Sequence, residues 1–252
     1  MEGIRLQGLT KSYALPGGTL RALDGLSLCL PSGSFTVVLG RSGSGKTTLL
    51  RLLAGLEAPT EGRILFPPAL ASRGRSAVGL VFQEPRLMPW LTVEENVAFA
   101  LKGRLDGKAV AERTDSTLAL LGLEAFRSAY PDQISGGMAQ RVALGRTLVF
   151  DPEVILMDEP FGALDYFTRR RLQGEIAELH RRTAKTFILV THDVEEALAL
   201  GDTVVVLEAG RVVDRLDILL PRPRETGWPQ FLPLRRRVLE AIVGGDDLAG
   251  DR

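Results

Sequence analysis

Apolar and polar positions along the chain follow two different periods. Short apolar runs of strand type lie near the start, at residues 4–9, 26–30 and 35–39, and turn-rich segments separate them. This opening predicts antiparallel strands. Further strand-like runs, near residue 64 and at residues 78–82, 154–157 and 187–190, alternate with helical spacings. Continuous apolar strands are typical of parallel sheets buried on both faces, so a mixed α/β core is predicted.

Helical spacing predicts the remaining elements. We expect helices after Gly45, within residues 93–121, at about 138–150 and 167–181, and at 194–200. Because residues 90–150 hold no clear strand, they favour a helical subdomain inserted into the core. Pro and Arg become frequent from residue 221, and residues 244–252 are typical of a frayed tail. We therefore expect one domain over residues 1–220 and a C-terminal extension, residues 221–252, with a short helix.

Composition narrows the class of protein. The 252 residues are 45% hydrophobic and 25% charged, enough for one large domain or two packed ones, and Lys plus Arg equals Asp plus Glu at 31 each. This balance makes nucleic acid a poor first expectation. No apolar run approaches the roughly 18 residues that span a bilayer, so we expect a cytoplasmic chain unless a partner holds it at a membrane. The single cysteine, Cys29, cannot form an internal disulfide and is expected to be a small buried side chain.

A glycine-rich segment lies between a strand-like run and a helical run. It reads Gly40-Arg41-Ser42-Gly43-Ser44-Gly45-Lys46-Thr47-Thr48. Glycines let successive backbone N–H groups turn toward phosphate oxygens, and the start of a helix adds a partial positive charge. Lys46 supplies a full charge to the β- and γ-phosphates, and the Thr47 hydroxyl can bind Mg²⁺. The pattern predicts a nucleotide-binding P-loop, and the alternative is a chance glycine-rich turn.

Two adjacent acidic residues end a predicted buried strand. Asp158 and Glu159 directly follow the apolar residues 154–157. Asp158 fits a ligand of the magnesium ion that accompanies a nucleotide, and Glu159 stands where a carboxylate can orient and deprotonate the attacking water. The alternative is an Asp-Glu pair that caps a helix before Pro160.

A second glycine-containing segment precedes this strand and reads Ile134-Ser135-Gly136-Gly137-Met138-Ala139-Gln140-Arg141. At the start of a predicted helix, its N–H groups and the Ser135 hydroxyl are suited to a phosphate, although Ser-Gly-Gly is also typical of a helix N-cap with a flexible turn. Together with the P-loop upstream, the segment resembles the signature motif of ABC ATPases. Most other P-loop families lack this motif.

The resemblance extends to further positions in the order of that family. Tyr13 resembles the aromatic residue that stacks on adenine, and Gln83 resembles the glutamine that senses Mg²⁺, the water and the membrane partner. Asp165 lies in a segment, residues 162–165, that resembles the D-loop, and His192 resembles the switch histidine that contacts the γ-phosphate. Each is weak alone, because such residues are more often structural or solvated, but their joint order is specific. His180, among charged neighbours on a predicted polar helix, is given no role.

The resemblance covers residues 4–220 and implies the ABC ATPase fold: a P-loop core with a mainly parallel sheet, an N-terminal antiparallel β subdomain and the inserted helical subdomain. It implies ATP and Mg²⁺ as ligands and a site shared by two copies. Lys46, Thr47, Asp158, Glu159 and His192 would come from one copy, and Ser135 and Gly137 from the other. Three residues depart from the common pattern, namely Met138, Gly145 and Thr147. Glycine inside a helix costs about 1 kcal/mol relative to alanine, so a softened helix is expected there.

The branch of the family follows from the loop after Gln83. The run at residues 81–91 and Met138 resemble the nitrate, sulfonate and taurine importers of bacteria. This implies a separate permease, indirect cooperation with a periplasmic solute-binding protein, and a peripheral position on the cytoplasmic side of the membrane. Leu87 and Trp90 would help to receive the permease, or else they simply pack the loop. Two alternatives stay open: a soluble ABC ATPase without a transport role and a P-loop phosphotransferase.

Overall fold

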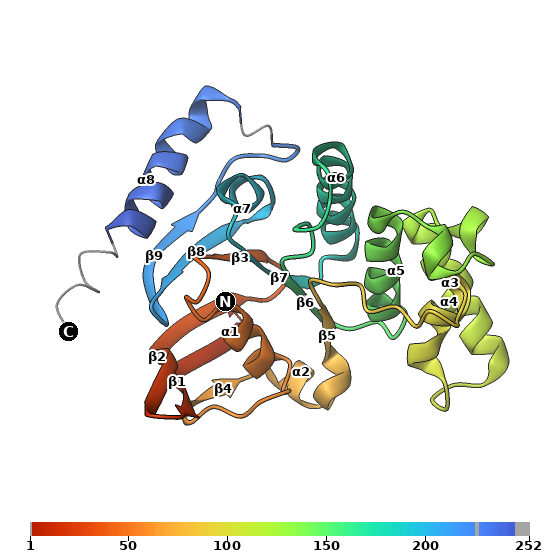
Figure 1. Cartoon of the computed structure of the whole chain (residues 1–252), viewed down its shortest axis with the longest axis horizontal. Helices are drawn as coiled ribbons and strands as arrows, with labels where there is room; N and C mark the ends of the chain where they lie inside the picture. Colours follow the sequence, from red (N-terminus) through yellow and green to blue (C-terminus); the bar gives the residue numbers. More distant parts are fainter. Residues whose placement is uncertain (1, 225–226, 245–252) are drawn as a thin grey trace. The chain divides into compact units, whose positions relative to one another are not determined.

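The structure is a computed structural model that describes residues 2–224 and 227–244 (Figure 1). The chain divides into two compact units, one formed by Met1–Arg75 together with Gln173–Arg252 and the other by Ser76–Leu172. We call them unit 1 and unit 2. Most of the predicted frayed tail lies outside the described residues.

An antiparallel sheet opens unit 1. Its strands β1 (Gly3–Leu15), β2 (Gly18–Pro31) and β4 (Glu61–Leu65) lie in the order β2-β1-β4. The predicted antiparallel opening is confirmed, but β1 and β2 are much longer than the apolar runs suggested. Their outer ends form a hairpin that closes at Gly17, which has a φ of 96°. Because most residues 14–21 are exposed, this part carries few of the apolar residues that indicated strands.

Unit 1 also contains parallel strands. In the order β7-β3-β8-β9 it holds β7 (Thr186–Thr191), β3 (Phe35–Leu39), β8 (Thr203–Glu208) and β9 (Arg211–Asp217), of which β9 is antiparallel to β8. Every residue of β3 and β7 is buried, as their continuous apolar sequence predicted. The strands β8 and β9 were not predicted from the sequence. The alternating exposure of β9 shows an edge strand with one solvated face.

Helices pack on these strands within unit 1. They are α1 (Lys46–Leu53), the short α2 (Pro68–Ala71), α7 (Val194–Leu200) and α8 (Leu232–Val243). Asp193 caps α7 by accepting hydrogen bonds from the backbone N–H groups of Glu195 and Glu196. The helix α8 packs against α7, β8 and β9, and its own Val238 and its N-cap residue Phe231 are buried. The expected short helix in the C-terminal extension is therefore present.

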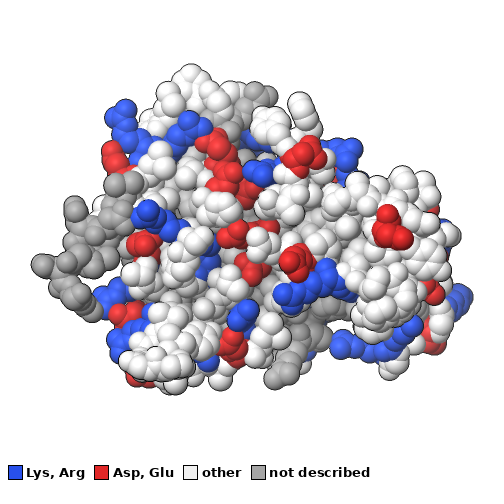
Figure 2. All heavy atoms as spheres, in the orientation of Figure 1, with Lys and Arg blue, Asp and Glu red and all other residues white. Residues whose placement is uncertain are grey.

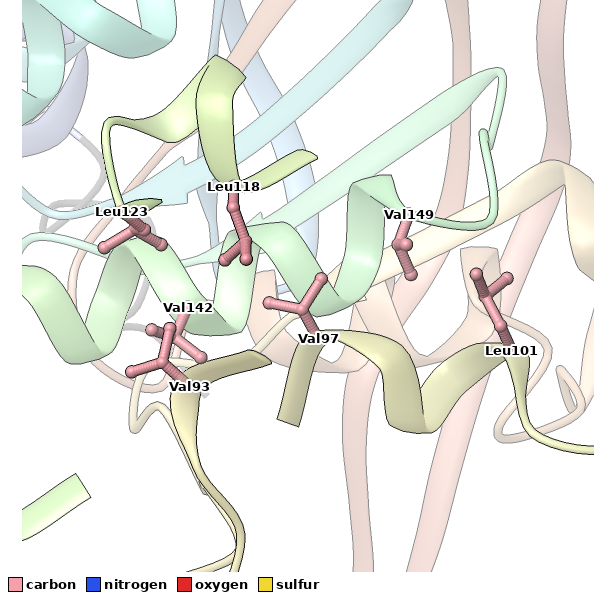
Figure 3. Packing of buried hydrophobic residues seen from close by; sticks show 7 residues of the cluster. All are labelled: Val93, Val97, Leu101, Leu118, Leu123, Val142 and Val149. Carbon is pink, nitrogen blue, oxygen red and sulfur yellow. The ribbon is translucent and has the colours of Figure 1, made fainter. Parts of the chain in front are cut away.

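Unit 2 combines a strand pair with helices. The strands β5 (Val78–Val81) and β6 (Val154–Asp158) are parallel, and the helices are α3 (Val93–Ala98), α4 (Gly107–Leu121), α5 (Gly136–Leu148) and the start of α6 (Tyr166–Thr183). Between the strands, α3, α4 and α5 enclose their own apolar cluster, of which Val97, Leu118 and Val142 are central members (Figure 3). Residues 93–149 thus consist of helices and the turns between them, with no strand, as their spacing predicted.

Gly145 lies where α5 approaches the other two helices most closely. A Cβ atom at this position would lie 3.0 Å from Leu121 Cδ1 and 3.2 Å from Val97 Cγ2. The glycine therefore permits close packing of three helices. We expected only a softened helix from this residue, and the structure supplies a packing reason for it.

Three further expectations concern surface charge, the burial of Cys29 and membrane-spanning segments. On the face drawn in Figure 2, Lys and Arg side chains are interspersed with Asp and Glu, in keeping with the balanced composition. Cys29 is only partly buried, so the expectation of a buried side chain was wrong, because its face of β2 is partly open to solvent. Among the residues that the structure describes, no helix is long and apolar enough to cross a membrane.

Candidate nucleotide-binding site

The glycine-rich segment of unit 1 forms a tight turn between β3 and α1. A Cβ atom on Gly40 would lie 2.2 Å from the carbonyl oxygen of Leu207, and Gly43 and Gly45 have φ angles of 85° and 101°. Side chains are therefore strongly disfavoured at these three positions, and the backbone can curl back over the start of the helix. Within the described chain, the buried Ser44 Oγ has no hydrogen-bond partner. A turn of this kind, with a buried hydroxyl in it, fits phosphate oxygens.

Lys46 occupies this turn. Its side chain is buried, and Nζ donates hydrogen bonds of 2.8 Å to the carbonyl oxygens of both Gly40 and Arg41. Burying an ammonium group is costly unless its donors are satisfied, and two backbone carbonyl oxygens accept from it here. The geometry thus holds a cation inside a ring of backbone, which suits an anionic ligand. The next residue, Thr47, is exposed at the start of α1.

Tyr13 lies near the same helix. Its hydroxyl donates a 2.6 Å hydrogen bond to Glu57 Oε2. Burial raises the pKa of Tyr13, the hydrogen bond to Glu57 raises it further, and the neighbouring Thr48 hydroxyl acts in the opposite direction. The contact with Thr48 places the phenol beside the first turn of α1.

His192 is brought to the P-loop by strand pairing. Leu39 of β3 is paired with Thr191 of β7, and the backbone N–H of Gly40 donates to the carbonyl oxygen of Thr191 at 3.3 Å. The P-loop and His192 therefore both follow directly from the carboxyl ends of neighbouring parallel strands, the edge at which α/β proteins bind ligands. The His192 side chain is exposed there. Unit 1 thus brings together Tyr13, the P-loop and His192.

Parallel pairing also groups the predicted residues of unit 2. Because Val81 of β5 pairs with Met157 of β6, Gln83 and the Asp158–Glu159 pair follow neighbouring strand ends. A Cβ atom on Gly162 would lie 3.5 Å from Gln83 Nε2, so the predicted D-loop passes close to this glutamine. Glu159 has a φ of 42°, which is unfavourable for a residue with a side chain. Strain of this kind is concentrated at functional sites.

The signature segment caps α5. Ser135 Oγ accepts a hydrogen bond from the backbone N–H of Met138 at 3.3 Å, so the helix-cap alternative is structurally correct and leaves Gly136 exposed beside it. A Cβ atom on Gly137 would lie 2.4 Å from Thr168 Cγ2, which explains this glycine by the close approach of α6. Asp165 caps α6 by accepting from the N–H groups of Phe167 and Thr168. The pKa of Asp165 is lowered, chiefly by hydrogen bonds from Thr168.

Sequence reasoning missed the residues that hold the loop after Gln83. Asn96, fully buried, hydrogen-bonds the backbone N–H and carbonyl of Met88 and the carbonyls of Leu91 and Thr92. The Arg146 guanidinium donates to the carbonyl oxygens of Arg86 and Pro85, at 2.8 and 2.9 Å. The available signal was a polar residue, Asn96, beside Val93 and Val97 on the apolar face of a helix.

The predicted metal ligands are hard oxygen donors. Thr47, Gln83 and Asp158 offer a hydroxyl, an amide oxygen and a carboxylate, the groups that Mg²⁺ prefers. Within residues 2–224 and 227–244, no group of three or more His, Cys, Asp or Glu side chains could hold a metal ion. Each of these groups, by its chemistry, suits a magnesium ion that takes its remaining ligands from water and phosphate.

A P-loop between a buried parallel strand and a helix defines a nucleotide-binding protein, and comparison with known proteins specifies which kind. The family model described as ABC transporter matches residues 23–162. An aliphatic sulfonates import ATP-binding protein, SsuB 1 of Pseudomonas fluorescens, is 48% identical over 87% of this chain and 80% of its own. Another SsuB 1, from Rhizobium johnstonii, is 44% identical over 96% of this chain and 87% of its own.

Solved structures similar to this chain include proteins of the same family. A dimeric ATP-binding cassette in a post-hydrolysis state with ADP and Pi is 32% identical, with a TM-score of 0.75 over 86% of this chain and all of that one. The cbiO1 protein of Clostridium perfringens is 27% identical, with a TM-score of 0.78 over 99% of this chain and all of that one. The chain belongs to the ABC transporter family, and it is an ATP-binding subunit with ATPase activity. The predicted ABC ATPase fold is confirmed.

Proposed function

We propose that this subunit uses Mg²⁺-dependent ATP hydrolysis to energise the import of an aliphatic sulfonate or a similar small solute through a separate permease. The observation that carries the reaction is the buried Lys46 ammonium inside a glycine turn. The solute class is supported by the sulfonate importers, which match this chain over most of their own length.

The residues of unit 1 would bind the nucleotide. The backbone N–H groups of residues 40–48 would hold the phosphates, and Lys46 would neutralise charge on the β- and γ-phosphates as it develops during cleavage. Tyr13 would stack on the adenine, and Thr47 would ligate Mg²⁺ through its hydroxyl. His192, exposed at the end of β7, would contact the γ-phosphate.

The residues of unit 2 would supply the hydrolytic groups. Asp158 and Gln83 would complete the magnesium ligands, and Glu159 would orient the water and accept its proton. The exposed Ser135 and Gly136, with Gly137, would bind the γ-phosphate of a nucleotide held by a second copy. Asp165, beside the start of α6, would also contribute to binding the nucleotide.

The partners follow from this assignment. Two copies would share two ATP sites, and the pair would bind the permease at the cytoplasmic face of the membrane. A periplasmic solute-binding protein would deliver the solute without contacting this chain. The dimeric cassette among the similar structures supports the pairing.

The decisive experiment is Glu159→Gln, because glutamine keeps the shape of the side chain and removes the base. We expect hydrolysis to fall by about 10² to 10⁴ while ATP binding persists, and ATP with Mg²⁺ to drive the variant into a dimer. Single-turnover kinetics and light scattering on a sizing column measure the two effects. A variant that hydrolyses ATP at the wild-type rate contradicts the role of Glu159 as the base, and a variant that stays monomeric with bound ATP contradicts the shared site.

A further inference from the structure

The Tyr13 hydroxyl donates its hydrogen bond to Glu57, which lies 44 positions away in the sequence. Tyr13 stands near the end of β1, and Glu57 lies in the segment that connects α1 to β4. The bond, 2.6 Å long, joins a phenol to a carboxylate and therefore belongs to the stronger, charge-assisted class. The phenol is thus anchored at its polar end.

The Glu57 carboxylate is itself held in place by neighbouring cations. Lys11 Nζ lies 3.2 Å from Glu57 Oε2, and Arg51 Nη1 lies 3.4 Å from Oε1, so each carboxylate oxygen has a cationic neighbour. Lys11 also donates to the carbonyl oxygen of Ala58 at 2.9 Å. The Tyr13 hydrogen bond, and with it that of Lys11, lowers the pKa of Glu57 below its ordinary value.

The same lysine covers one face of the Tyr13 ring. Lys11 and Tyr13 both lie on β1, two residues apart. The Lys11 ammonium lies over the Tyr13 ring, 5.0 Å from its centroid. A flat ligand that stacks on the opposite face of the ring would not have to displace this charge.

We propose that Glu57 is a positioning residue for the nucleotide base: through its hydrogen bond it holds the Tyr13 ring ready for stacking, with Lys11 covering the other face. The inference rests on the proposed nucleotide role of Tyr13. A ring held in its binding orientation loses less conformational freedom when a base binds. Glu57 itself touches no nucleotide in this proposal.

The test separates the base from the phosphates. Binding of ADP and of pyrophosphate to the isolated full chain is measured by calorimetry, for the wild type, Glu57→Ala, Glu57→Gln, Tyr13→Phe and Tyr13→Ala. One aromatic stacking contact corresponds to about two- to tenfold in a dissociation constant. We expect Glu57→Ala and Tyr13→Phe to weaken ADP binding within that range, Tyr13→Ala to weaken it at least as much, and none to change pyrophosphate binding.

Two comparisons distinguish positioning from a general structural role. Adding Glu57→Ala to Tyr13→Ala has no further effect on ADP affinity, and Glu57→Gln, whose amide oxygen still accepts the hydrogen bond, stays closer to the wild type than Glu57→Ala. The exposed Glu61, four positions further along the chain, provides the matched control Glu61→Ala. Equal losses for ADP and pyrophosphate, unchanged ADP affinity, or a full Glu57→Ala effect without the Tyr13 ring would overturn the proposal.

Failure of the underlying function has a different signature. Lys46→Ala removes the charge that holds the phosphates, so it weakens ADP and pyrophosphate together. If Lys46→Ala leaves both affinities unchanged, the P-loop assignment is wrong whatever Glu57 does. If Glu57→Ala unfolds at a lower temperature than the measurement allows, Tyr13→Phe removes the same hydrogen bond from the other side and decides the question.

Discussion

His180 lies on the buried face of α6, although its neighbours in the sequence are charged. Its Nε2–H donates to the carbonyl oxygen of Gly33 at 3.1 Å, and its ring packs edge-on against Phe35 and Phe187. Burial lowers the pKa of His180 below its ordinary value of 6.5, and the nearby Arg222 lowers it further. The residue is therefore a neutral part of the core of unit 1.

This burial predicts how stability depends on pH. The folded chain resists protonation of His180, so below about pH 6.5 the unfolded chain binds more protons and the free energy of unfolding falls as the pH falls. Above that value the contribution is fully present. Urea unfolding at about pH 7.5 and about pH 5.5 measures the difference. We expect His180→Gln, which retains a donor for Gly33, to reduce the pH dependence. A His180→Gln variant whose stability depends on pH as steeply as that of the wild type contradicts the assignment.

Two glycines in helix interiors show that packing around a helix can override the intrinsic helix propensity of a residue. Gly145 of α5 stands against Val97 of α3 and Leu121 of α4, whereas a Cβ atom on Gly174 of α6 would meet no atom within 4 Å. Helix propensity alone favours alanine at both positions by up to about 1 kcal/mol. At Gly145, packing disfavours alanine, because the neighbouring Val97 is fully buried and its branched side chain has little freedom to move.

The same substitution at the two sites is therefore expected to have opposite signs. Gly145→Ala overpacks three helices and should lower the free energy of unfolding by up to about 2 kcal/mol, since the packing cost exceeds the gain in propensity. Gly174→Ala should raise it by about 0.5 to 1 kcal/mol. Chemical denaturation of both variants checks the pair. Stabilisation by Gly145→Ala would show that α3 and α4 move apart at no cost.

At the scale of the whole molecule, the loop after Gln83 connects hydrolysis to a partner in the proposed function. Its backbone is held by Asn96 and Arg146, and Leu87 packs on the apolar cluster of unit 2. Trp90, by contrast, is 72% exposed. A large apolar side chain exposed on a well-held loop is typical of a contact with another protein.

Trp90→Ser tests this contact without disturbing the fold, because the side chain is mostly in solvent already. We expect the isolated subunit to keep its ATPase rate and unfolding temperature, while the complex reconstituted with its permease loses most of its solute uptake, because buried tryptophans often contribute 2 kcal/mol or more to an interface. Leu219, which is 93% exposed in unit 1, supplies the control Leu219→Ser, for which uptake should be unchanged. Full uptake by the Trp90 variant means that the permease binds elsewhere.

Local sequence was sufficient for the features that depend on neighbouring residues. The P-loop turn needs glycines at set spacings, the buried strands need continuous apolar runs, and the caps at Ser135 and Asp165 need one polar side chain before a helix. Each of these requirements is met within a few positions along the chain. The predicted α/β class and the helices of residues 93–149 followed from them.

Tertiary structure decided what depends on residues far apart in the sequence. The partner of Tyr13 lies 44 positions away, the carbonyl that binds His180 lies 147 positions away, and the reason for Gly145 lies in two other helices. The strands β8 and β9 were missed, and the burial of Cys29 was overestimated. A side chain's burial and hydrogen-bond partners are properties of the space around it, and that space is filled by segments whose proximity local patterns do not encode.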